Sequence, residues 1–252
     1  MQAEVGVSES KISLRVISGW GVAPAILHTW LETLPPHFDI QTVDIPDLTA
    51  GQRLSVDERC ECLLQSAPDN TYWLGWSLGG AIALDLAAYS PETVRGIITL
   101  ATNPCFVAQS DWPGMDREQF EAFLHSYQVN AAKTLQRFAS LQIAGAQDSR
   151  AQLRELKRHL LEPLPVLSDL LKLLAVDRRE LVKDLRVPLV SLLATDDALV
   201  PARVAQSLAG LGANVRAEII CQASHLLFQD QPATVTESLV DWISLQELKH
   251  AR

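Results

Sequence analysis

Cysteine is scarce in this chain, with four among 252 residues: Cys60, Cys62, Cys105 and Cys221. Their spacing matches neither a zinc site nor a thioredoxin-type redox pair. Cys60 and Cys62 lie two positions apart on an expected helix and would point in different directions. We therefore expect all four to be reduced, unreactive packing residues, with no metal site among them.

Positive charge and long apolar runs are also lacking. Lys and Arg number 21 against 30 Asp and Glu, a formal net charge of −9, which argues against binding nucleic acid or an anionic membrane through bulk charge. No stretch of 18 apolar residues occurs, and the first ten residues, "MQAEVGVSES", lack the apolar region of a signal peptide. We expect a cytoplasmic, monomeric protein with no nucleic-acid or membrane partner.

What the chain does contain is apolar residues, 48% of the total, enough for a substantial core. Short β-branched runs alternate with longer stretches that suit crossover helices, such as 55–66, 78–89 and 201–210. The expected strands cover 12–17, 38–44, 71–75, 96–101, 188–194 and 215–220. This alternation predicts an α/β fold, in which a mostly parallel sheet carries helices on both faces.

One interval interrupts the alternation. Between "GIITLA" and "PLVSLLA" no convincing strand occurs, but helical patterns cover 116–127, 130–144, 147–161 and 166–175. A structureless loop of that length is improbable in a compact domain. We therefore expect a core made of residues 1–105 and 180–252, with an inserted helical cap over 106–179.

The pentapeptide Gly75-Trp76-Ser77-Leu78-Gly79 matches G-x-S-x-G between an expected strand and an expected helix. This sharp turn exposes a serine nucleophile at a helix N-terminus, and the small residues let neighbouring chain approach. The alternative is a serine that only caps the helix.

An acid and a histidine follow in the order that such a nucleophile requires. Asp196 and Asp197 end an expected strand, where the active sites of open α/β sheets gather, and adjacent residues cannot both face one pocket. Turn formation or helix capping is the alternative role for either. His225 lies in a loop after the last expected strand, and an imidazole can activate a serine at neutral pH. The order serine, acid, histidine is that of the α/β-hydrolase triad.

The loop after the first strand contains "SGWG" at 18–21, whose glycines can direct a backbone N–H into a pocket. With the N–H of Leu78, directly after the nucleophile, this loop predicts an oxyanion hole. The alternative is an ordinary glycine-rich turn without a ligand.

At this point the chain resembles the α/β-hydrolase superfamily, and within it the pimeloyl-[acyl-carrier-protein] methyl ester esterases of biotin synthesis. The resemblance covers most of the chain and is carried by "SGWG", "WLGWSLGG" (73–80), "ATNPCF" (101–106), "DWPG" (111–114), "RFASLQIAG" (137–145), "DALVP" (197–201) and "ASHLLF" (223–228). It implies an inserted cap, no cofactor, and hydrolysis of the methyl ester of a pimeloyl chain on acyl carrier protein.

The resemblance also implies site residues. The implied nucleophile, acid and base are Ser77, Asp197 and His225, and Asp197 is chosen over Asp196 because Asp-x-x-Val-Pro resembles the family's acid loop. The implied oxyanion donors are the N–H groups of Trp20 and Leu78. The implied substrate pocket comprises Trp20, Trp76, Phe106 and Phe138.

Residues 133–159 hold six basic and two acidic side chains, a local net charge of +4 in an acidic protein. The family resemblance implies that Lys133, Arg137, Arg150 and Arg154 bind the carrier protein and its phosphopantetheine. Lys133 keeps the charge that an arginine would have but lacks the bidentate fork for phosphate. The alternative for such a run is a solvated helix face.

Two departures from the family pattern suggest a diverged member. Ser18 stands where the family usually has histidine, and "DIPDLTAG" is a degenerate form of the usual Gly-x-Gly-x-Ser loop. Two other functions stay open: a general short-chain carboxylesterase without carrier preference, and a non-catalytic ligand-binding protein of this fold.

Overall fold

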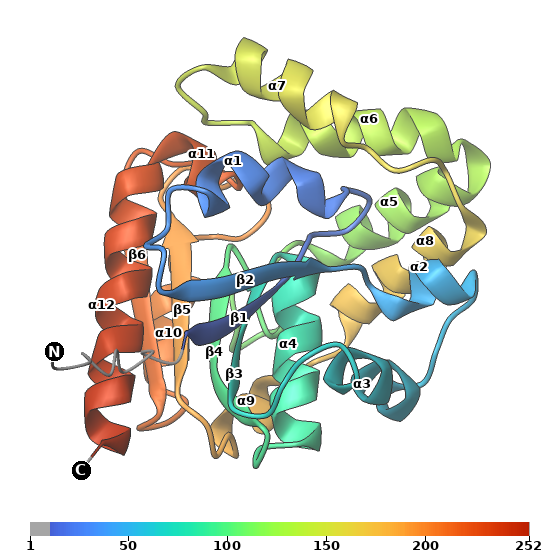
Figure 1. Cartoon of the computed structure of the whole chain (residues 1–252). Coiled ribbons are helices and arrows are strands. Elements are labelled where there is room, and N and C mark those ends of the chain that lie inside the picture. The colour runs from blue at the N-terminus through green and yellow to red at the C-terminus, as the bar shows by residue number, and fades with distance from the viewer. Residues whose placement is uncertain (1–10, 252) are drawn as a thin grey trace, which may run out of the picture.

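The computed structural model describes residues 11–251 and contains one six-stranded sheet (Figure 1). The strand order is β2-β1-β3-β4-β5-β6, and every neighbouring pair is parallel. The strands are β1 Ile12–Ile17, β2 Phe38–Val43, β3 Thr71–Trp76, β4 Val94–Leu100, β5 Leu189–Ala194 and β6 Val215–Ile220. The sequence patterns predicted all six, with ends that differ by two residues at most. The predicted parallel sheet is confirmed.

Helices cover both faces of the sheet because its strands are apolar on both sides. The helices are α1 His28–Leu31, α2 Pro46–Ala50, α3 Val56–Leu64, α4 Leu78–Tyr89, α5 Arg117–Val129, α6 Ala131–Gln142, α7 Ser149–Arg158, α8 Pro165–Lys172, α9 Arg179–Lys183, α10 Val204–Ala209, α11 Leu227–Asp230 and α12 Pro232–His250. On β3, Tyr72, Leu74 and Trp76 belong to the apolar cluster beneath α1 and α12, whereas Trp73 belongs to the cluster beneath α3, α4 and α10.

Helices α5 to α8 belong to the segment between β4 and β5 and lie together at one side of the molecule (Figure 1). Apolar side chains of α5, α6 and α8 join the same cluster as those of α4, so the segment packs directly on the sheet domain. The division into core and cap at 106–179 stays a prediction.

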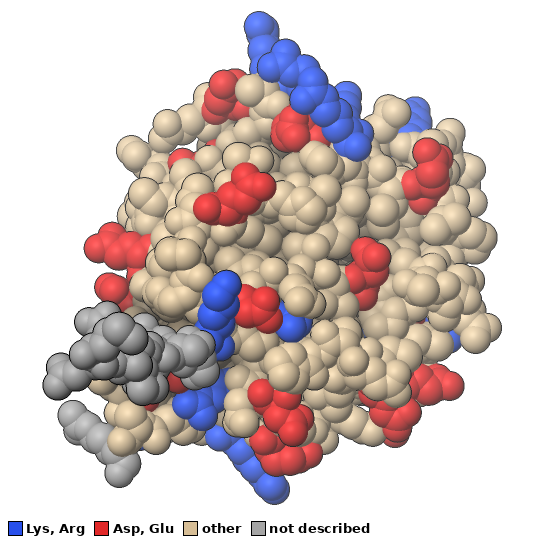
Figure 2. All heavy atoms as spheres, in the orientation of Figure 1, with Lys and Arg blue, Asp and Glu red and all other residues tan. Residues whose placement is uncertain are grey.

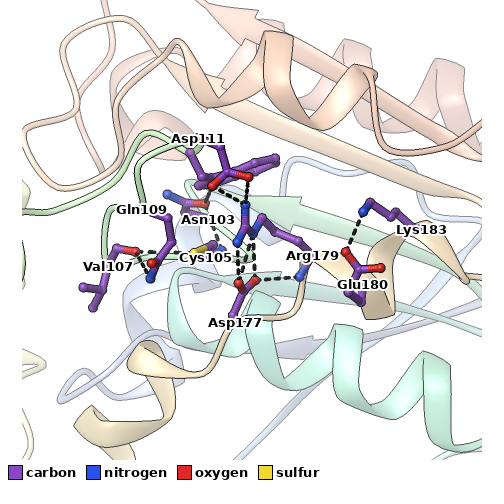
Figure 3. A network of polar contacts seen from close by, with 10 residues as sticks. Asn103, Cys105, Val107, Gln109, Asp111, Asp177, Arg179, Glu180 and Lys183 are labelled. Carbon is purple, nitrogen blue, oxygen red and sulfur yellow. Dashed lines mark hydrogen bonds and ion pairs between the residues drawn. The ribbon is translucent and has the colours of Figure 1, made fainter.

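The two connections of this segment to the sheet domain are held together by polar contacts. Figure 3 shows the Arg179 guanidinium between the carboxylates of Asp111 and Asp177, with N–O distances of 2.7 to 3.0 Å. Arg179 also lies over the Trp112 ring, 5.5 Å from its centroid. Nearby, Arg178 forms a buried bidentate pair with Asp85 on α4, at 2.7 and 2.8 Å. The connections are therefore fixed to each other and to the helix that follows Ser77.

The cysteines differ from the sequence-based prediction in one respect. All four are free, and Cys60 and Cys105 are buried, but Cys62 and Cys221 are exposed, so the prediction that all four are packing residues is wrong. The outward face of α3 carries Cys62, two positions after the inward Cys60. Burial, aided by the Asp177 carboxylate, raises the pKa of Cys105 to about 11, which keeps this thiol protonated.

Within residues 11–251, no helix is both long and apolar enough to cross a membrane. The prediction that concerns residues 1–10, the absence of a signal peptide, lies outside the described residues.

Candidate active site

Ser77 occupies the sharp turn between β3 and α4. Its backbone has φ 56° and ψ −117°, a region that L-residues other than glycine rarely adopt. The glycines at either side allow this turn. A Cβ on Gly75 would collide with the backbone of Gly79 and Gly80, and one on Gly79 would collide with the carbonyl of Ile17 at the end of β1. The two glycines of the G-x-S-x-G motif therefore allow the backbones of β1, β3 and α4 to approach one another closely.

Hydrogen bonds from β4 and the residues after it hold the turn. The Ser77 N–H donates to the Leu100 carbonyl at 2.8 Å, and the Thr102 hydroxyl donates to the Ser77 carbonyl at 3.0 Å. Gly80 packs against Thr102, where a side chain would collide with the threonine. Sequence reasoning did not identify Thr102, because nothing in the sequence marks a threonine that supports a turn 25 residues earlier.

The structure brings Asp197 and His225 together at the ends of β5 and β6. His225 Nδ1 lies 2.7 Å from Asp197 Oδ2, and both side chains are almost completely buried. The other oxygen of Asp197 accepts the N–H groups of Leu199 and Val200 at 2.8 and 3.0 Å. Three donors thus orient the carboxylate, which fixes the histidine tautomer that carries its proton on Nδ1.

Asp196 lies elsewhere. It is exposed, and within residues 11–251 its carboxylate accepts only the hydroxyl of the neighbouring Thr195, at 3.1 Å. Its backbone N–H donates to the Ala223 carbonyl at 2.9 Å. This bond joins the acid loop, residues 195–203, to the histidine loop, residues 221–226. Of the two carboxylates that the sequence left open, only Asp197 can orient His225.

The second nitrogen of His225 is available for chemistry. Nε2 is buried and has no hydrogen-bond partner within residues 11–251, Ser77 Oγ included. The His225 carbonyl accepts the indole N–H of Trp76 at 3.0 Å, which ties the histidine loop to the residue next to Ser77. Catalytic hydrogen bonds are often incomplete before substrate binds, so this geometry suits a base that contacts Ser77 during the reaction.

The Trp20 and Leu78 backbone N–H groups donate no hydrogen bond within the described part of the chain. Leu78 is the first residue of α4, where helical N–H groups lack an intrahelical acceptor. The Trp20 indole donates to the Leu167 carbonyl on α8 at 2.7 Å. Just after Trp20, Val22 pairs with Leu160 beyond α7 in an antiparallel bridge. The inserted helices therefore hold the expected oxyanion loop in place.

The aromatic residues that were predicted to line a pocket fall into two groups. The ring of Trp20 packs edge-on against Phe138 at 5.1 Å, and Phe106 packs against Phe120 at 6.2 Å. Trp76 instead packs against His225 and Phe228, on the opposite side of the sheet from the Trp20 cluster. The role of these four as pocket residues stays a prediction.

Two cavities flank the site. One, of about 10 Å³, lies among apolar side chains of α5, α6 and α8 and includes Phe106, Phe138 and Leu199 of the acid loop. The other, of about 760 Å³, separates α1 from α7 and is lined by Trp30, Gln152, Arg154 and Phe228 among others. Ser77, Asp197 and His225 are not among the residues that line these two cavities, and 8% of the Ser77 surface is exposed.

The four basic residues predicted to bind a carrier are all exposed and have no carboxylate partner among residues 11–251. Lys133 and Arg137 lie on α6, and Arg150 and Arg154 lie on α7. Figure 2 shows Lys and Arg side chains at the top of the view, over these helices. These cations are free to meet an acidic partner.

The described residues contain no group of three or more His, Cys, Asp or Glu side chains arranged to hold a metal ion.

A family model described as "Alpha/beta hydrolase family" matches residues 17–238. The chain belongs to the alpha/beta hydrolase family. Curated relatives in this family include pimeloyl-[acyl-carrier protein] methyl ester esterases from Serratia marcescens and Yersinia enterocolitica. The first is 34% identical and covers 90% of this chain and 91% of the relative; the second is 32% identical and covers 93% and 94%.

Solved structures show the same alpha/beta hydrolase fold at lower identity. A hydrolase from Oleispira antarctica aligns over 94% of this chain and 92% of its own with a TM-score of 0.78 and 18% identity. An esterase from Exiguobacterium antarcticum aligns over 93% and 92% with a TM-score of 0.75 and 17% identity. The predicted fold class, and the prediction that this chain is an ester hydrolase, are confirmed.

Proposed function

We propose that this protein is a serine carboxylesterase that hydrolyses the methyl ester of a pimeloyl chain carried on acyl carrier protein. The supporting observation is the similarity to esterases of that name over more than 90% of both chains. The paired Asp197 and His225, the strained Ser77 turn and the exposed cations of α6 and α7 fit this activity.

In the proposed cycle, Ser77 Oγ attacks the ester carbonyl while His225 Nε2 takes its proton. The tetrahedral intermediate collapses, the C–O bond to the methoxy group breaks, and His225 returns the proton to the departing methanol. Water then attacks the acyl-enzyme, again with His225 as the base, and releases the carboxylate and free Ser77. Asp197 keeps the imidazole in the correct tautomer and stabilises its cationic form.

The backbone N–H groups of Trp20 and Leu78 would stabilise the oxyanion of both tetrahedral intermediates. Each such donor is worth about 3–4 kcal/mol in comparable sites. Their lack of other acceptors in residues 11–251 supports this role, because a donor already committed elsewhere contributes little.

The test of the proposed function uses the purified protein and the methyl ester of pimeloyl-acyl carrier protein. We expect release of methanol and the free acid, and we expect Ser77→Ala to reduce the rate to background while the protein stays folded. Restoration of biotin-independent growth in a bacterium that lacks its own esterase would support the pathway. Retained hydrolysis by Ser77→Ala would contradict the nucleophile assignment.

One observation favours the general short-chain esterase as a second candidate. The apolar cavity near Phe138 measures about 10 Å³, barely the space of one water molecule, so a long acyl chain could enter it only if the side chains that line it moved. A kcat/KM that falls steadily from acetyl to longer soluble esters, with no gain from carrier attachment, would favour this candidate. Failure of Ser77 to react with a fluorophosphonate probe would instead indicate a non-catalytic binding protein.

A further inference from the structure

Asp230, the last residue of the short helix α11, makes three hydrogen bonds that the proposed catalytic cycle does not use. One carboxylate oxygen accepts both the backbone N–H and the hydroxyl of Ser224, at 2.7 and 2.6 Å. The other accepts the side-chain amide of Gln152 on α7, at 2.6 Å. A carboxylate with three such donors has a fixed orientation.

These contacts reach the backbone on both sides of His225. The Ser224 N–H is bound by Asp230, and the Leu226 N–H donates to the Ser224 hydroxyl at 3.2 Å. The His225 carbonyl is bound by the Trp76 indole. Three consecutive residues are therefore anchored, and two of the anchors depend on Asp230.

Gln152 on α7 donates a side-chain hydrogen bond to Asp230 on α11, the helix that follows the His225 loop. It is partly buried, whereas Arg150 and Arg154, two residues away in each direction, are exposed. Residues two apart on a helix do not share a face, so α7 turns its amide toward the histidine loop and its cations toward solvent. The chain just beyond α7 pairs with the expected oxyanion loop at Val22.

We infer that Asp230 is a positioning residue for His225, and that through Gln152 it ties the histidine loop to helix α7 of the inserted segment. The inference rests on the proposed function, because it explains how the proposed catalytic base, His225, is held in position. Side-chain geometry at an active site has to be kept within fractions of an ångström, and supporting hydrogen bonds provide that precision.

The test measures how fast a fluorophosphonate labels Ser77, because this reaction needs an activated serine but no acyl or carrier binding. For Asp230→Ala we expect labelling and kcat on p-nitrophenyl acetate to fall about tenfold or more, with KM changed by less than about twofold. Asp230→Asn keeps one acceptor oxygen and should fall less. All rates are taken at a temperature at which circular dichroism shows each variant folded.

Gln152→Ala gives a second, milder perturbation on α7. We expect labelling to slow about threefold, and we expect no further loss when the change is added to Asp230→Ala, because the two act through one hydrogen bond. Asp241→Ala on α12 and Gln136→Ala on α6 are matched controls: both side chains are exposed and outside this network, and both variants should react like the unchanged protein.

A folded Asp230→Ala that labels at the unchanged rate would overturn the inference, and so would full additivity of the two changes. If Asp230→Ala does not fold, the double-mutant cycle of Gln152→Ala with Asp230→Asn replaces it. Unchanged labelling in both single variants, or full additivity of the two changes, would then overturn the inference. Failure of the unchanged protein to react with the probe would overturn the proposed function and this inference together. Normal reaction of the unchanged protein and of every variant would overturn only the inference.

Discussion

The backbone of Ser77 is held in an unfavourable conformation because two glycines let three chain segments meet around it. At Gly79 an added Cβ would strike the Ile17 carbonyl, which belongs to a sheet strand and cannot move aside. Strain of this kind persists only when the surrounding structure enforces it, and here the enforcement comes from β1 and β4.

Gly79→Ala should therefore lower both the melting temperature and the activity. Displacing a strand from the turn removes packing worth about 1–3 kcal/mol and shifts Ser77 from its place. Gly210→Ala is the matched control, because the nearest atom to its added Cβ lies at 3.5 Å and its backbone is already helical. Thermal unfolding and esterase assays of both variants check the prediction, which equal behaviour of the two would contradict.

The two neighbouring carboxylates should differ sharply in their contribution to rate. Asp197→Asn leaves the shape of the site intact but favours the wrong imidazole tautomer, so kcat should fall by about 10⁴-fold. Asp196→Asn changes an exposed side chain and should leave kcat within about twofold of the unchanged protein. Steady-state assays with a soluble ester distinguish the two, and a comparable loss in both variants would refute the assignment of the acid.

Helix α2 lies in the segment "DIPDLTAG" after β2, where the family usually has a Gly-x-Gly-x-Ser loop, and it packs against α3. Asp47 on α2 and Arg59 on α3 form a buried bidentate pair at 2.6 and 2.9 Å, and Asp47 also accepts the Leu54 N–H. One arginine nitrogen, Nη1, has no partner in the described residues. A buried pair of this kind determines how the two helices meet, because neither charge can be left alone in the interior.

Asp47→Ala should destabilise the protein by about 3–5 kcal/mol, because it leaves the Arg59 guanidinium buried and uncompensated. Asp69→Ala, which removes an exposed carboxylate from a loop, should change stability by less than about 0.5 kcal/mol. Urea unfolding of the two variants gives both free energies. Equal, small changes would show that Arg59 finds water or another partner.

The connection between the inserted segment and the sheet domain should weaken in acid. Hydrogen bonds from Arg179 lower the pKa of Asp177 below its usual value. A lowered folded-state pKa means that the stabilisation is complete above the unfolded pKa of about 3.9 and is lost as the pH falls from there toward the folded pKa. Both side chains are partly exposed, so the effect amounts to less than about 1 kcal/mol.

Asp177→Asn cannot lose that charge interaction. We therefore expect its melting temperature to fall less than that of the unchanged protein between about pH 6 and about pH 3, even though it starts lower. Melting curves over this range provide the measurement, and parallel decline of the two proteins would contradict a role for Asp177 in acid sensitivity.

Sequence patterns predicted the strands and the proposed reacting groups because both depend on local signals. Alternation of apolar runs gave β1 to β6, and the order Ser77, Asp197, His225 follows from the chain itself. The same alternation carried an unused signal: Trp76 is in phase with Tyr72 and Leu74, and all three face the α1 and α12 layer. The contact between Gln152 and Asp230 could not be predicted from the sequence. The two residues are 78 positions apart, and they meet because of where α7 lies in the fold.

At the scale of the whole molecule, charge is unevenly distributed. The protein carries a formal net charge of −9, yet its exposed α6 and α7 present Lys133, Arg137, Arg150 and Arg154 without carboxylate partners in the described structure. An acidic carrier protein would be repelled by most of the surface and attracted here, so orientation and association rate would depend on these side chains.

Charge reversal on α7 tests this directly. The double variant Arg150→Glu and Arg154→Glu should lower kcat/KM for a carrier-bound ester by about tenfold or more at low salt, and added salt should narrow the difference because it screens exposed charges. Hydrolysis of a small soluble ester should be unaffected, since neither residue contacts Ser77, Asp197 or His225. The double variant Arg53→Glu and Lys249→Glu is the control for net charge alone, because it reverses two exposed cations outside α6 and α7 and makes the same change of −4. Equal losses in this control and the α7 variant would place the effect in overall charge, and unchanged kinetics of the α7 variant on the carrier substrate would exclude α7 as the docking surface.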